Sequence, residues 1–167
     1  MGHPILRKIA KRLTLDDLLS DEVQRLIDNM VKTMREMNGA GLAAPQVHES
    51  LQILVIEVKN SSRYPDKEEI SLHILINPKI IYKSKEIVSD FEGCLSIDRL
   101  RAKVPRHKEI HLKALDRFGE EILIKNSGFL AIALQHEIDH LEGKLFLDHV
   151  VEYELMTQEK EFYEYHC

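Results

Sequence analysis

The chain has 167 residues, of which 44% are hydrophobic and 31% are charged. This length and composition allow one hydrophobic core and fit a single domain better than two. The net charge of -5 and the isoelectric point near 6.0 exclude a general attraction to nucleic acid or to anionic membranes, because no basic cluster outweighs the acidic residues. We therefore expect neither direct nucleic-acid binding nor a membrane partner.

Targeting signals and disulfides are not evident. No apolar run approaches the roughly 20 residues that a membrane-spanning helix requires. The opening residues, MGHPILRKIAKRL, lack the apolar segment of a secretory signal. Cys94 lies inside the chain and Cys167 is its last residue, which is a poor arrangement for a structural disulfide. A reducing cytoplasm is the location we expect.

Residues 21–37 form the first predicted helix, because apolar side chains recur there at helical spacing. Ser20 is a suitable cap for its first turn, and the helix should end at Asn38-Gly39. The apolar positions are Val23, Leu26, Ile27, Met30, Met34 and Met37. The next stretch, GAGLAAPQV at residues 39–47, is rich in small residues and contains a proline, which predicts a loop.

Strands are predicted in the middle of the chain. Residues 51–58 and 74–82 are rich in β-formers and flank a polar segment, NSSRYPDKEE, whose composition suits an exposed insertion. Residues 109–115 alternate apolar and polar side chains, turn at DRFG, and continue into EEILIK. This pattern predicts an antiparallel hairpin.

A second helix is predicted from Ser127-Gly128 to the glycine at position 143. The order of helix, several strands and helix lacks regular βαβ alternation, so we expect an α+β fold with mostly antiparallel sheets around this buried helix. Residues 1–151 are expected to form a single catalytic domain. The remaining residues, 152–167, are expected to be an acidic C-terminal tail or a short helix.

The second helix contains the pattern HExxH. His136 and His140 are one helical turn apart and project from the same face, so both imidazoles can reach one metal ion, with Glu137 beside a metal-bound water. The alternative is an amphipathic helix that carries two histidines by chance. A third ligand distinguishes the two interpretations.

Candidates for this third ligand lie on both sides of the helix. In zinc proteases with HExxHxxGxxH the last position is histidine, but here it is Phe146; more distant candidates are His149, Glu154 and Glu159. Cys94, in the sequence EGCLS, is the better candidate, since a thiolate and two imidazoles leave a tetrahedral position open for water. The alternative for Cys94 is a small buried hydrophobic residue.

Three stretches in order resemble the peptide deformylase family: GAGLAAPQ at residues 39–46, EGCLS at 92–96 and QHEIDH at 135–140. The similarity continues through GHPILRK, LINP, VPR and ALDRFGE, and so covers nearly the whole chain. The resemblance implies a bacterial-type metallohydrolase of protein biosynthesis. Its reaction removes the N-formyl group from the N-terminal formyl-methionine of newly synthesised proteins and releases formate.

The resemblance also implies the roles of the catalytic residues. Cys94, His136 and His140 bind one divalent metal ion, for which we expect iron(II), with nickel, cobalt or zinc as substitutes. Glu137 is the general base and then the acid that protonates the leaving amine. The Gln46 side-chain amide and the backbone N–H of Leu95 stabilise the negative charge on the formyl oxygen.

Further residues are implied to bind or support the substrate. Those expected to wall the methionine pocket, contact the peptide backbone or lie at the mouth of the site are Phe129, Ile132, Ala133, Ala40, Gly41, Gly93 and Arg101. Glu92 is expected to pair with Arg106, and Asp139 to support the metal ligands. The partners implied are formyl-methionyl nascent peptides and hydroxamate-type inhibitors that bind the metal.

The sequence departs from the family at two places. Asp98 stands where the family commonly has proline after EGCLSI, which we expect to loosen this loop. The C-terminal residues are acidic, whereas some members carry a basic C-terminal helix; we therefore expect weak or differently located ribosome contact. Two alternatives to an active deformylase are a zinc protease with another third ligand and a non-enzymatic relative that binds formylated peptides.

Overall fold

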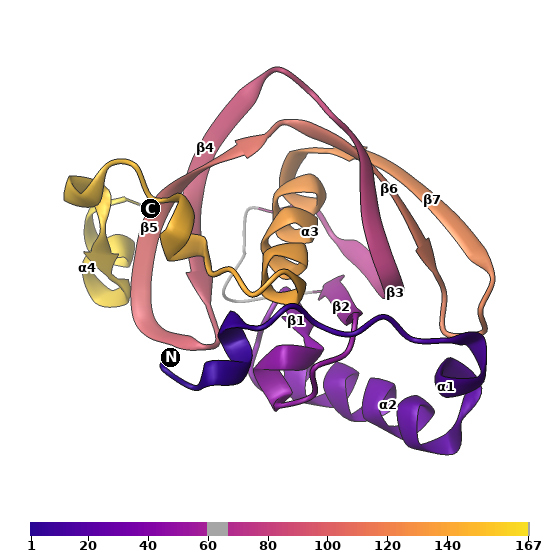
Figure 1. Cartoon of the computed structure of the whole chain (residues 1–167). Coiled ribbons are helices and arrows are strands. Elements are labelled where there is room, and N and C mark those ends of the chain that lie inside the picture. The colour runs from indigo at the N-terminus through magenta and orange to yellow at the C-terminus, as the bar shows by residue number, and fades with distance from the viewer. Residues whose placement is uncertain (60–66, 167) are drawn as a thin grey trace.

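Two antiparallel sheets and a central helix make up the fold (Figure 1). The structure is a computed structural model that describes residues 1–59 and 67–166. One sheet has the strand order β1-β2-β3-β6-β7 and the other has the order β4-β5-β8. The prediction of an α+β fold with antiparallel sheets is therefore confirmed. The strands are β1 (Gly41–Ala43), β2 (Ile53–Val58), β3 (Ile70–Lys83), β4 (Ile87–Cys94), β5 (Ile97–His107), β6 (Glu109–Leu115), β7 (Glu121–Ser127) and β8 (Thr157–Gln158).

Four α-helices and four short 3-10 helices join these strands in the described part of the chain. The α-helices are α1 (Leu15–Leu19), α2 (Asp21–Glu36), α3 (Gly128–Leu141) and α4 (Glu159–Tyr165). The 3-10 helices are η1 (Pro4–Arg7), η2 (Ala44–Val47), η3 (Phe146–His149) and η4 (Tyr153–Leu155). None of the described helices combines the length and the apolar character that spanning a bilayer requires.

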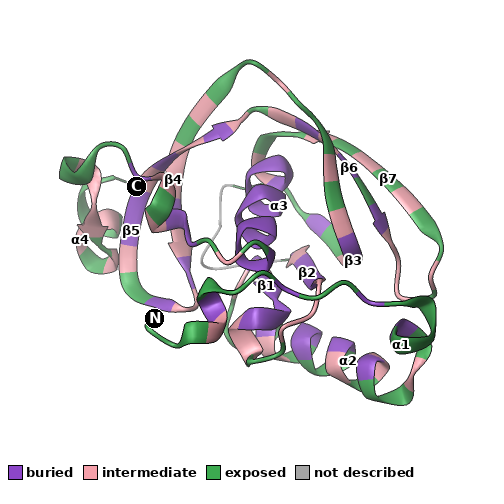
Figure 2. Ribbon diagram, in the orientation of Figure 1, coloured by how far each residue is buried: buried purple, intermediate pink, exposed green. Residues whose placement is uncertain are grey.

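Helix α3 lies at the centre of the molecule. Every residue from Leu130 to Leu141 is buried, so the helix is enclosed almost on all sides (Figure 2). Its apolar side chains, among them Leu134 and Ile138, pack in one cluster with Leu54 and Leu112 from the larger sheet. Its polar side chains are equally buried. Such groups are costly to bury unless they are partnered, and most of them belong to the candidate site.

Helix α2 confirms the first predicted helix. The Ser20 hydroxyl caps it by accepting a hydrogen bond from the Val23 N–H at 3.3 Å, and its apolar face packs against β1 and β2. The helix ends at Glu36, and Met37, predicted to belong to its apolar face, is the C-cap and is exposed.

The predicted hairpin is also confirmed, as strands β6 and β7. Its turn is closed by Asp116, whose side chain accepts hydrogen bonds from the N–H groups of Phe118 and Glu120 at 2.8 and 2.9 Å. Gly119 has a φ of 89°, a conformation that glycine adopts without strain. Local turn chemistry thus sets the register of these strands.

Several predictions about the connecting segments were wrong. Residues 39–47 are not a loop, because residues 41–43 pair with β2 as strand β1 and residues 44–47 form η2. The predicted strand at 74–82 is longer and begins at Ile70. The hairpin of β4 and β5, in which Cys94 is the last residue of β4, was not predicted. Most of the predicted insertion, residues 60–66, lies outside the described residues.

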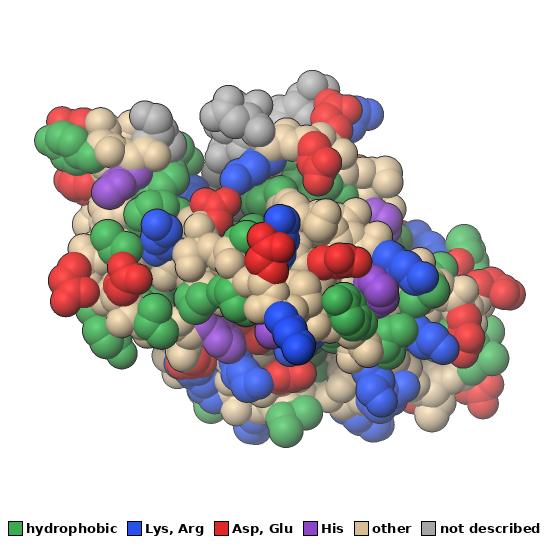
Figure 3. Space-filling model, turned by 90° about the horizontal axis from the view of Figure 1, so that it is seen from above, with side chains coloured by type: hydrophobic (Ala, Val, Ile, Leu, Met, Phe, Trp, Pro, Cys, Tyr) green, Lys and Arg blue, Asp and Glu red, His purple; other side chains and the backbone are tan. Residues whose placement is uncertain are grey.

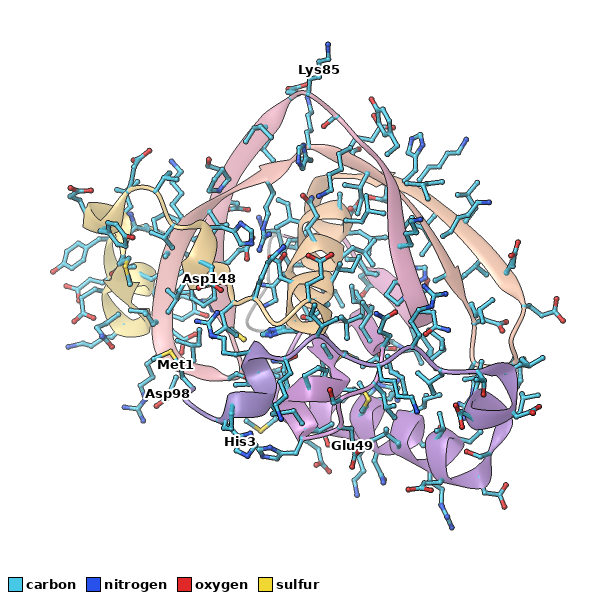
Figure 4. All side chains as sticks on the ribbon, viewed as in Figure 1. Met1, His3, Glu49, Lys85, Asp98 and Asp148 are labelled. Carbon is cyan, nitrogen blue, oxygen red and sulfur yellow. The ribbon has the colours of Figure 1, made fainter. Side chains whose placement is uncertain are left out.

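The surface has no single sign of charge on the face drawn in Figure 3, where acidic and basic side chains are interspersed. The tip between β3 and β4, at Lys85, points away from the centre (Figure 4). Asp98 lies at the edge of the molecule beside Met1, and its side chain is 88% exposed. The substitution of Asp98 for the usual proline therefore falls outside the walls of the pocket described below.

Candidate active site

A pocket lies between strands β1 and β4 and the face of helix α3. In the described residues, β1 pairs only with β2 and β4 pairs only with β5, so both are edge strands. The pocket brings together most of the residues expected from the sequence: Ala40, Gly41, Gln46, Glu92, Gly93, Cys94, Leu95, Arg101, Phe129, Ile132, Ala133, His136 and Glu137. His140, Arg106 and Asp139 are not among its lining residues and lie behind this surface.

Cys94, His136 and His140 form a compact group of potential metal ligands. All three residues are buried, and one ligand atom from each lies within 4.8 Å of the others. The Cys94 Sγ is 3.3 Å from the His140 Nε2. Helix α3 places the two imidazoles one turn apart, and the end of β4 supplies the sulfur. The chemistry and size of this donor set fit a divalent transition metal.

The other predicted candidates for a third ligand lie elsewhere. His149 is 2.9 Å from a carboxylate oxygen of Asp139, and Glu159 is paired with Arg101. Glu154 is exposed in η4. The structure therefore brings Cys94, and none of these three residues, to the two histidines.

Two N–H groups point at the cysteine sulfur. The Gln46 Nε2 lies 3.5 Å from the Cys94 Sγ, and the Ser96 backbone N lies 3.4 Å from it. The Gln46 amide is fixed in this orientation, since its Oε1 accepts a hydrogen bond from the Ala43 N–H at 2.8 Å. Ser96 was not predicted from the sequence. Donors around the sulfur suit a negatively charged ligand.

A buried chain of charges orients His136. Its Nδ1 lies 2.7 Å from the Glu92 Oε2, which leaves its Nε2 for the ligand group. Arg106 contacts Glu92 at 2.7 and 3.0 Å and Asp139 at 2.6 Å. Burial alone would raise the pKa of Glu92, but the hydrogen bonds from His136 and Arg106 outweigh burial and lower the pKa to about 2. Glu92 is therefore a carboxylate at neutral pH.

Glu137 is buried beside the ligand group, and its Oε2 has no hydrogen-bond partner among the described residues. Burial is the largest cause that raises its pKa, to about 7, and the carboxylates of Glu92 and Asp139 add to the rise, while His136 opposes it. A carboxyl group with a pKa near neutrality can both accept and donate a proton at physiological pH. This is the property that acid–base catalysis requires.

Gly41 has a contact that the sequence did not reveal. A Cβ at this position would lie 2.4 Å from the Glu137 Oε1, so only glycine allows β1 to pass this close to the carboxylate. From the sequence we expected Gly41 to contact the peptide. The structure adds a second constraint on Gly41, its close approach to Glu137. This approach follows from the pairing of β1 with β2, and no pattern in the neighbouring sequence indicates it.

One apolar wall of the pocket comes from the first turns of α3. Ile132 and Ala133 are 8% and 7% exposed, and Phe129 lies one turn earlier. Three pocket residues were not predicted from the sequence: Gly39, Asp90 and Phe91. Asp90 and Phe91 belong to β4, whose sequence IVSDFEGC lacks a regular alternation of apolar and polar residues and so gave little signal of a strand.

This fold and this site define a class of protein, the metallohydrolases: a buried Cys/His/His group stands beside a buried carboxyl group at the wall of an open pocket. Residues 1–155 match the polypeptide deformylase family. The chain belongs to this family, whose members are metal-dependent enzymes that remove the N-formyl group from newly made proteins.

Relatives of known sequence support the assignment. The chain is 39% identical over 150 residues to peptide deformylase 2 of a Nostoc species, covering 90% of this chain and 83% of that one. It is 41% identical over 146 residues to peptide deformylase 1 of Nitrosomonas europaea, covering 87% and 82%. It is 40% identical over 156 residues to the chloroplastic peptide deformylase 1A of Solanum lycopersicum, covering 88% of this chain but only 56% of that relative.

Solved structures agree with the fold. The class I type b peptide deformylase of Acinetobacter baumannii, in a crystal structure with Met-Ala-Ser bound, is 37% identical and superposes with a TM-score of 0.87 over 90% of this chain and 94% of that one. A peptide deformylase of Synechococcus elongatus in complex with actinonin is 36% identical, with a TM-score of 0.79 over 90% and 76%.

Proposed function

We propose that this protein hydrolyses the N-formyl group of formyl-methionyl nascent peptides and releases formate and a free amino terminus. One observation carries the proposal: the ligand atoms of Cys94, His136 and His140 lie within 4.8 Å of one another, beside the buried Glu137. A hydrolase that acts on an amide needs a polarising centre and an acid–base group in this relation.

The metal is proposed to be held by the Cys94 Sγ and the ring nitrogens of His136 and His140 that face it. Iron(II) is the ion we propose, with nickel, cobalt and zinc as substitutes. When bound, such an ion supplies a Lewis acid that activates water and polarises the formyl carbonyl. Asp139 and Glu92 support the ligands through Arg106 and through the Nδ1 of His136.

The remaining chemistry is assigned to side chains and backbone of this chain. Glu137 takes a proton from the attacking water and later gives a proton to the nitrogen of the departing amine. The Gln46 Nε2–H and the Leu95 N–H donate hydrogen bonds to the formyl oxygen as negative charge develops on it. The position of Gln46 supports this assignment, because its side chain lines the pocket beside the ligand group.

The substrate is proposed to enter with its methionine side chain against Phe129, Ile132 and Ala133. Its backbone then lies along the edges of β1 and β4, where Ala40 and Gly93 permit close approach. The Met-Ala-Ser complex of the Acinetobacter baumannii relative supports a peptide in this pocket. The actinonin complexes of that enzyme and of the Synechococcus elongatus enzyme support our expectation that hydroxamate-type inhibitors bind here.

Three broader proposals accompany the reaction. Residues 1–151 form one catalytic domain, and residues 152–167 form an acidic C-terminal segment. Contact with the ribosome is weak or lies elsewhere, because this segment contains five glutamates and one lysine, and its net negative charge would be repelled by RNA phosphates. The glutamates are Glu152, Glu154, Glu159, Glu161 and Glu164, and the lysine is Lys160. The cytoplasm remains the location that we predict.

The test is formate release from formyl-Met-Ala-Ser by protein purified without oxygen and loaded with iron or nickel. We expect turnover in the wild type and a loss of about 100-fold or more in Glu137→Gln with its metal retained. Metal content separates the alternatives: Cys94→Ser should lose the ion, whereas Glu154→Ala should keep it. An active Glu137→Gln variant, or metal retained in Cys94→Ser and lost in Glu154→Ala, would contradict the proposal.

A further inference from the structure

The C-terminal segment contacts a buried cation of the pocket, Arg101. Strand β8 pairs with β5 at Leu100 and Arg101, and helix α4 lies against β5 at the far side of the molecule from α1 (Figure 1). The Arg101 side chain is 4% exposed and lines the pocket. Its Nη2 is 2.9 Å from the Glu159 Oε1 and 3.3 Å from the Tyr163 hydroxyl, both on α4.

The guanidinium of Arg101 is held on several sides. Its carbon lies 5.1 Å from the centre of the Phe162 ring and 5.8 Å from that of Tyr163. Phe162 in turn contacts the ring of Phe91, a pocket residue on β4, with centroids 5.1 Å apart. Helix α4 is therefore joined to the pocket wall by an aromatic contact and by an ion pair.

Arg101 also covers the strand edge along which the peptide is proposed to lie. Gly93 is its partner across β4 and β5, and a Cβ on Gly93 would lie 2.9 Å from both the Cδ and the Nε of Arg101. The Arg101 Nε is buried and has no hydrogen-bond partner among the described residues. A buried N–H beside the path of a peptide can donate to one of its carbonyl groups.

The charge of this site is balanced by Glu159. Asp90, another charged residue among the described residues that line the pocket, is paired with Lys67 at 2.8 Å. Glu92 is paired with Arg106 and with His136, and Glu137 is buried beside the metal-ligand group. The Glu159 carboxylate thus neutralises the charge of the Arg101 guanidinium. Without this carboxylate, a bound peptide would meet a net positive charge.

We propose that the segment from Thr157 to Tyr163 is part of the peptide site. In this proposal, Glu159 determines the preference of the site for acidic or basic residues after formyl-methionine. The proposal rests on the deformylase function proposed above. Glu159 acts through Arg101 and is a positioning residue. With Glu159 present, charge on these residues should change the rate little. Without Glu159, the uncompensated charge of Arg101 favours acidic peptides and disfavours basic ones.

The test compares kcat/KM for formyl-Met-Ala-Ser with versions in which Ala or Ser is replaced by Glu or Lys. In Glu159→Gln the ratio of acidic to basic substrate should rise about three- to tenfold at low salt and fall back as salt is added. Arg101→Gln should shift the ratio in the opposite direction, because it removes the positive charge while the Glu159 carboxylate stays in place. The double variant should return toward the wild type.

Glu164→Gln is the matched control. It removes the same charge from the same helix at an exposed position, so the ratio should stay at the wild-type value. Binding of the product Met-Ala-Ser and its Glu and Lys versions, followed by calorimetry, should show the same shift without turnover. A fall of kcat/KM by the same factor for all substrates would indicate only structural damage and would contradict the proposal.

Failure of this inference is distinct from failure of the proposed function. Normal turnover of formyl-Met-Ala-Ser with an unchanged charge ratio in Glu159→Gln overturns the role of Glu159 and leaves the deformylase activity standing. An equal shift in Glu164→Gln also overturns it, because the effect would then be one of net charge. No formate from metal-loaded wild type overturns the proposed function and this inference with it.

Discussion

Gly41 on β1 and Glu137 on α3 are in such close contact that the glycine hydrogen faces the carboxylate where any side chain would overlap it: a Cβ at Gly41 would stand 2.4 Å from the Oε1 and 2.8 Å from the Cδ of Glu137. The carboxylate cannot retreat easily, because α3 is buried on almost all sides. A strand edge thus sets the position of the proposed acid–base group.

Gly41→Ala should therefore lower kcat by about 100-fold, because displacement of Glu137 removes most of its acid–base contribution. The bound metal should remain, since none of the three ligand residues is touched. Steady-state formate release and metal analysis check this. Gly39→Ala is the matched comparison: its Cβ would lie 2.9 Å from the flexible end of the Leu95 side chain and 3.3 Å from the Gly41 carbonyl oxygen, and it would not meet Glu137, so a much smaller loss is expected. Equal losses in both variants would contradict the contact argument.

Much of this fold could be predicted from local patterns. Helix α2 and the β6–β7 hairpin follow from periodicity, a capping serine and a turn with glycine, all encoded within a few residues. Strands β1 and β4 could not be predicted this way. Gly41–Ala43 is too short and too rich in small residues to resemble a strand, and it is extended because β2 pairs with it.

The candidate site divides in the same manner. His136, Glu137 and His140 are close in sequence, so helical geometry alone brings them together, and Cys94 follows from the chemistry of metal ligands. The contact of Gly41 with Glu137 and the pairing of Arg101 with Glu159 join segments about 60 to 100 residues apart. Contacts of this kind depend on tertiary packing, so no characteristic spacing of residues in the sequence predicts them.

Arg106 is predicted to be the most sensitive charged residue outside the ligand group. Arg106→Met leaves the Glu92 and Asp139 carboxylates buried without their cation, which should lower the free energy of unfolding by about 3 to 5 kcal/mol. Urea unfolding in the presence of a chelator measures this without a contribution from metal binding.

Lys108→Met is its control, because it removes a cation from an exposed pair with Glu86, whose side chains are 49% and 64% exposed. The expected change is within about 0.5 kcal/mol. If Lys108→Met lowers the free energy of unfolding as much as Arg106→Met does, removal of any cation destabilises this region. Burial of the pair would then not explain the effect of Arg106→Met.

The pair of Arg35 and Glu57 predicts a dependence of stability on pH. The hydrogen bonds from Arg35, at 2.5 and 2.9 Å, lower the pKa of Glu57 from its ordinary value of 4.5, with burial opposing the shift. A lowered pKa in the folded state means that the pair stabilises the protein above pH 4.5, and that this contribution is lost as the pH falls through the lowered pKa.

Arg35→Gln should therefore unfold at a lower temperature than the wild type at neutral pH, and the two unfolding temperatures should converge as the pH falls below 4.5 and through the lowered pKa of Glu57. Thermal unfolding followed by circular dichroism across this range checks the prediction. Lys32→Gln, on the same helix but in an exposed pair with Glu36 at 3.8 Å, should show little difference at any pH. A constant gap between Arg35→Gln and wild type at all pH values would contradict the role of Glu57.

Metal removal and oxidation test the proposed ligand group directly. Removal by a chelator should abolish formate release and lower the unfolding temperature, because an ion that binds only the folded state stabilises it by mass action. Addition of iron or nickel should restore both.

A thiolate bound to iron(II) is susceptible to oxidation by oxygen, so air should inactivate the iron form faster than the nickel form. Oxidation of Cys94 should be visible by mass spectrometry. Equal decay of the two forms would remove the support for iron as the native metal, while leaving the assignment of Cys94, His136 and His140 to be judged by metal content alone.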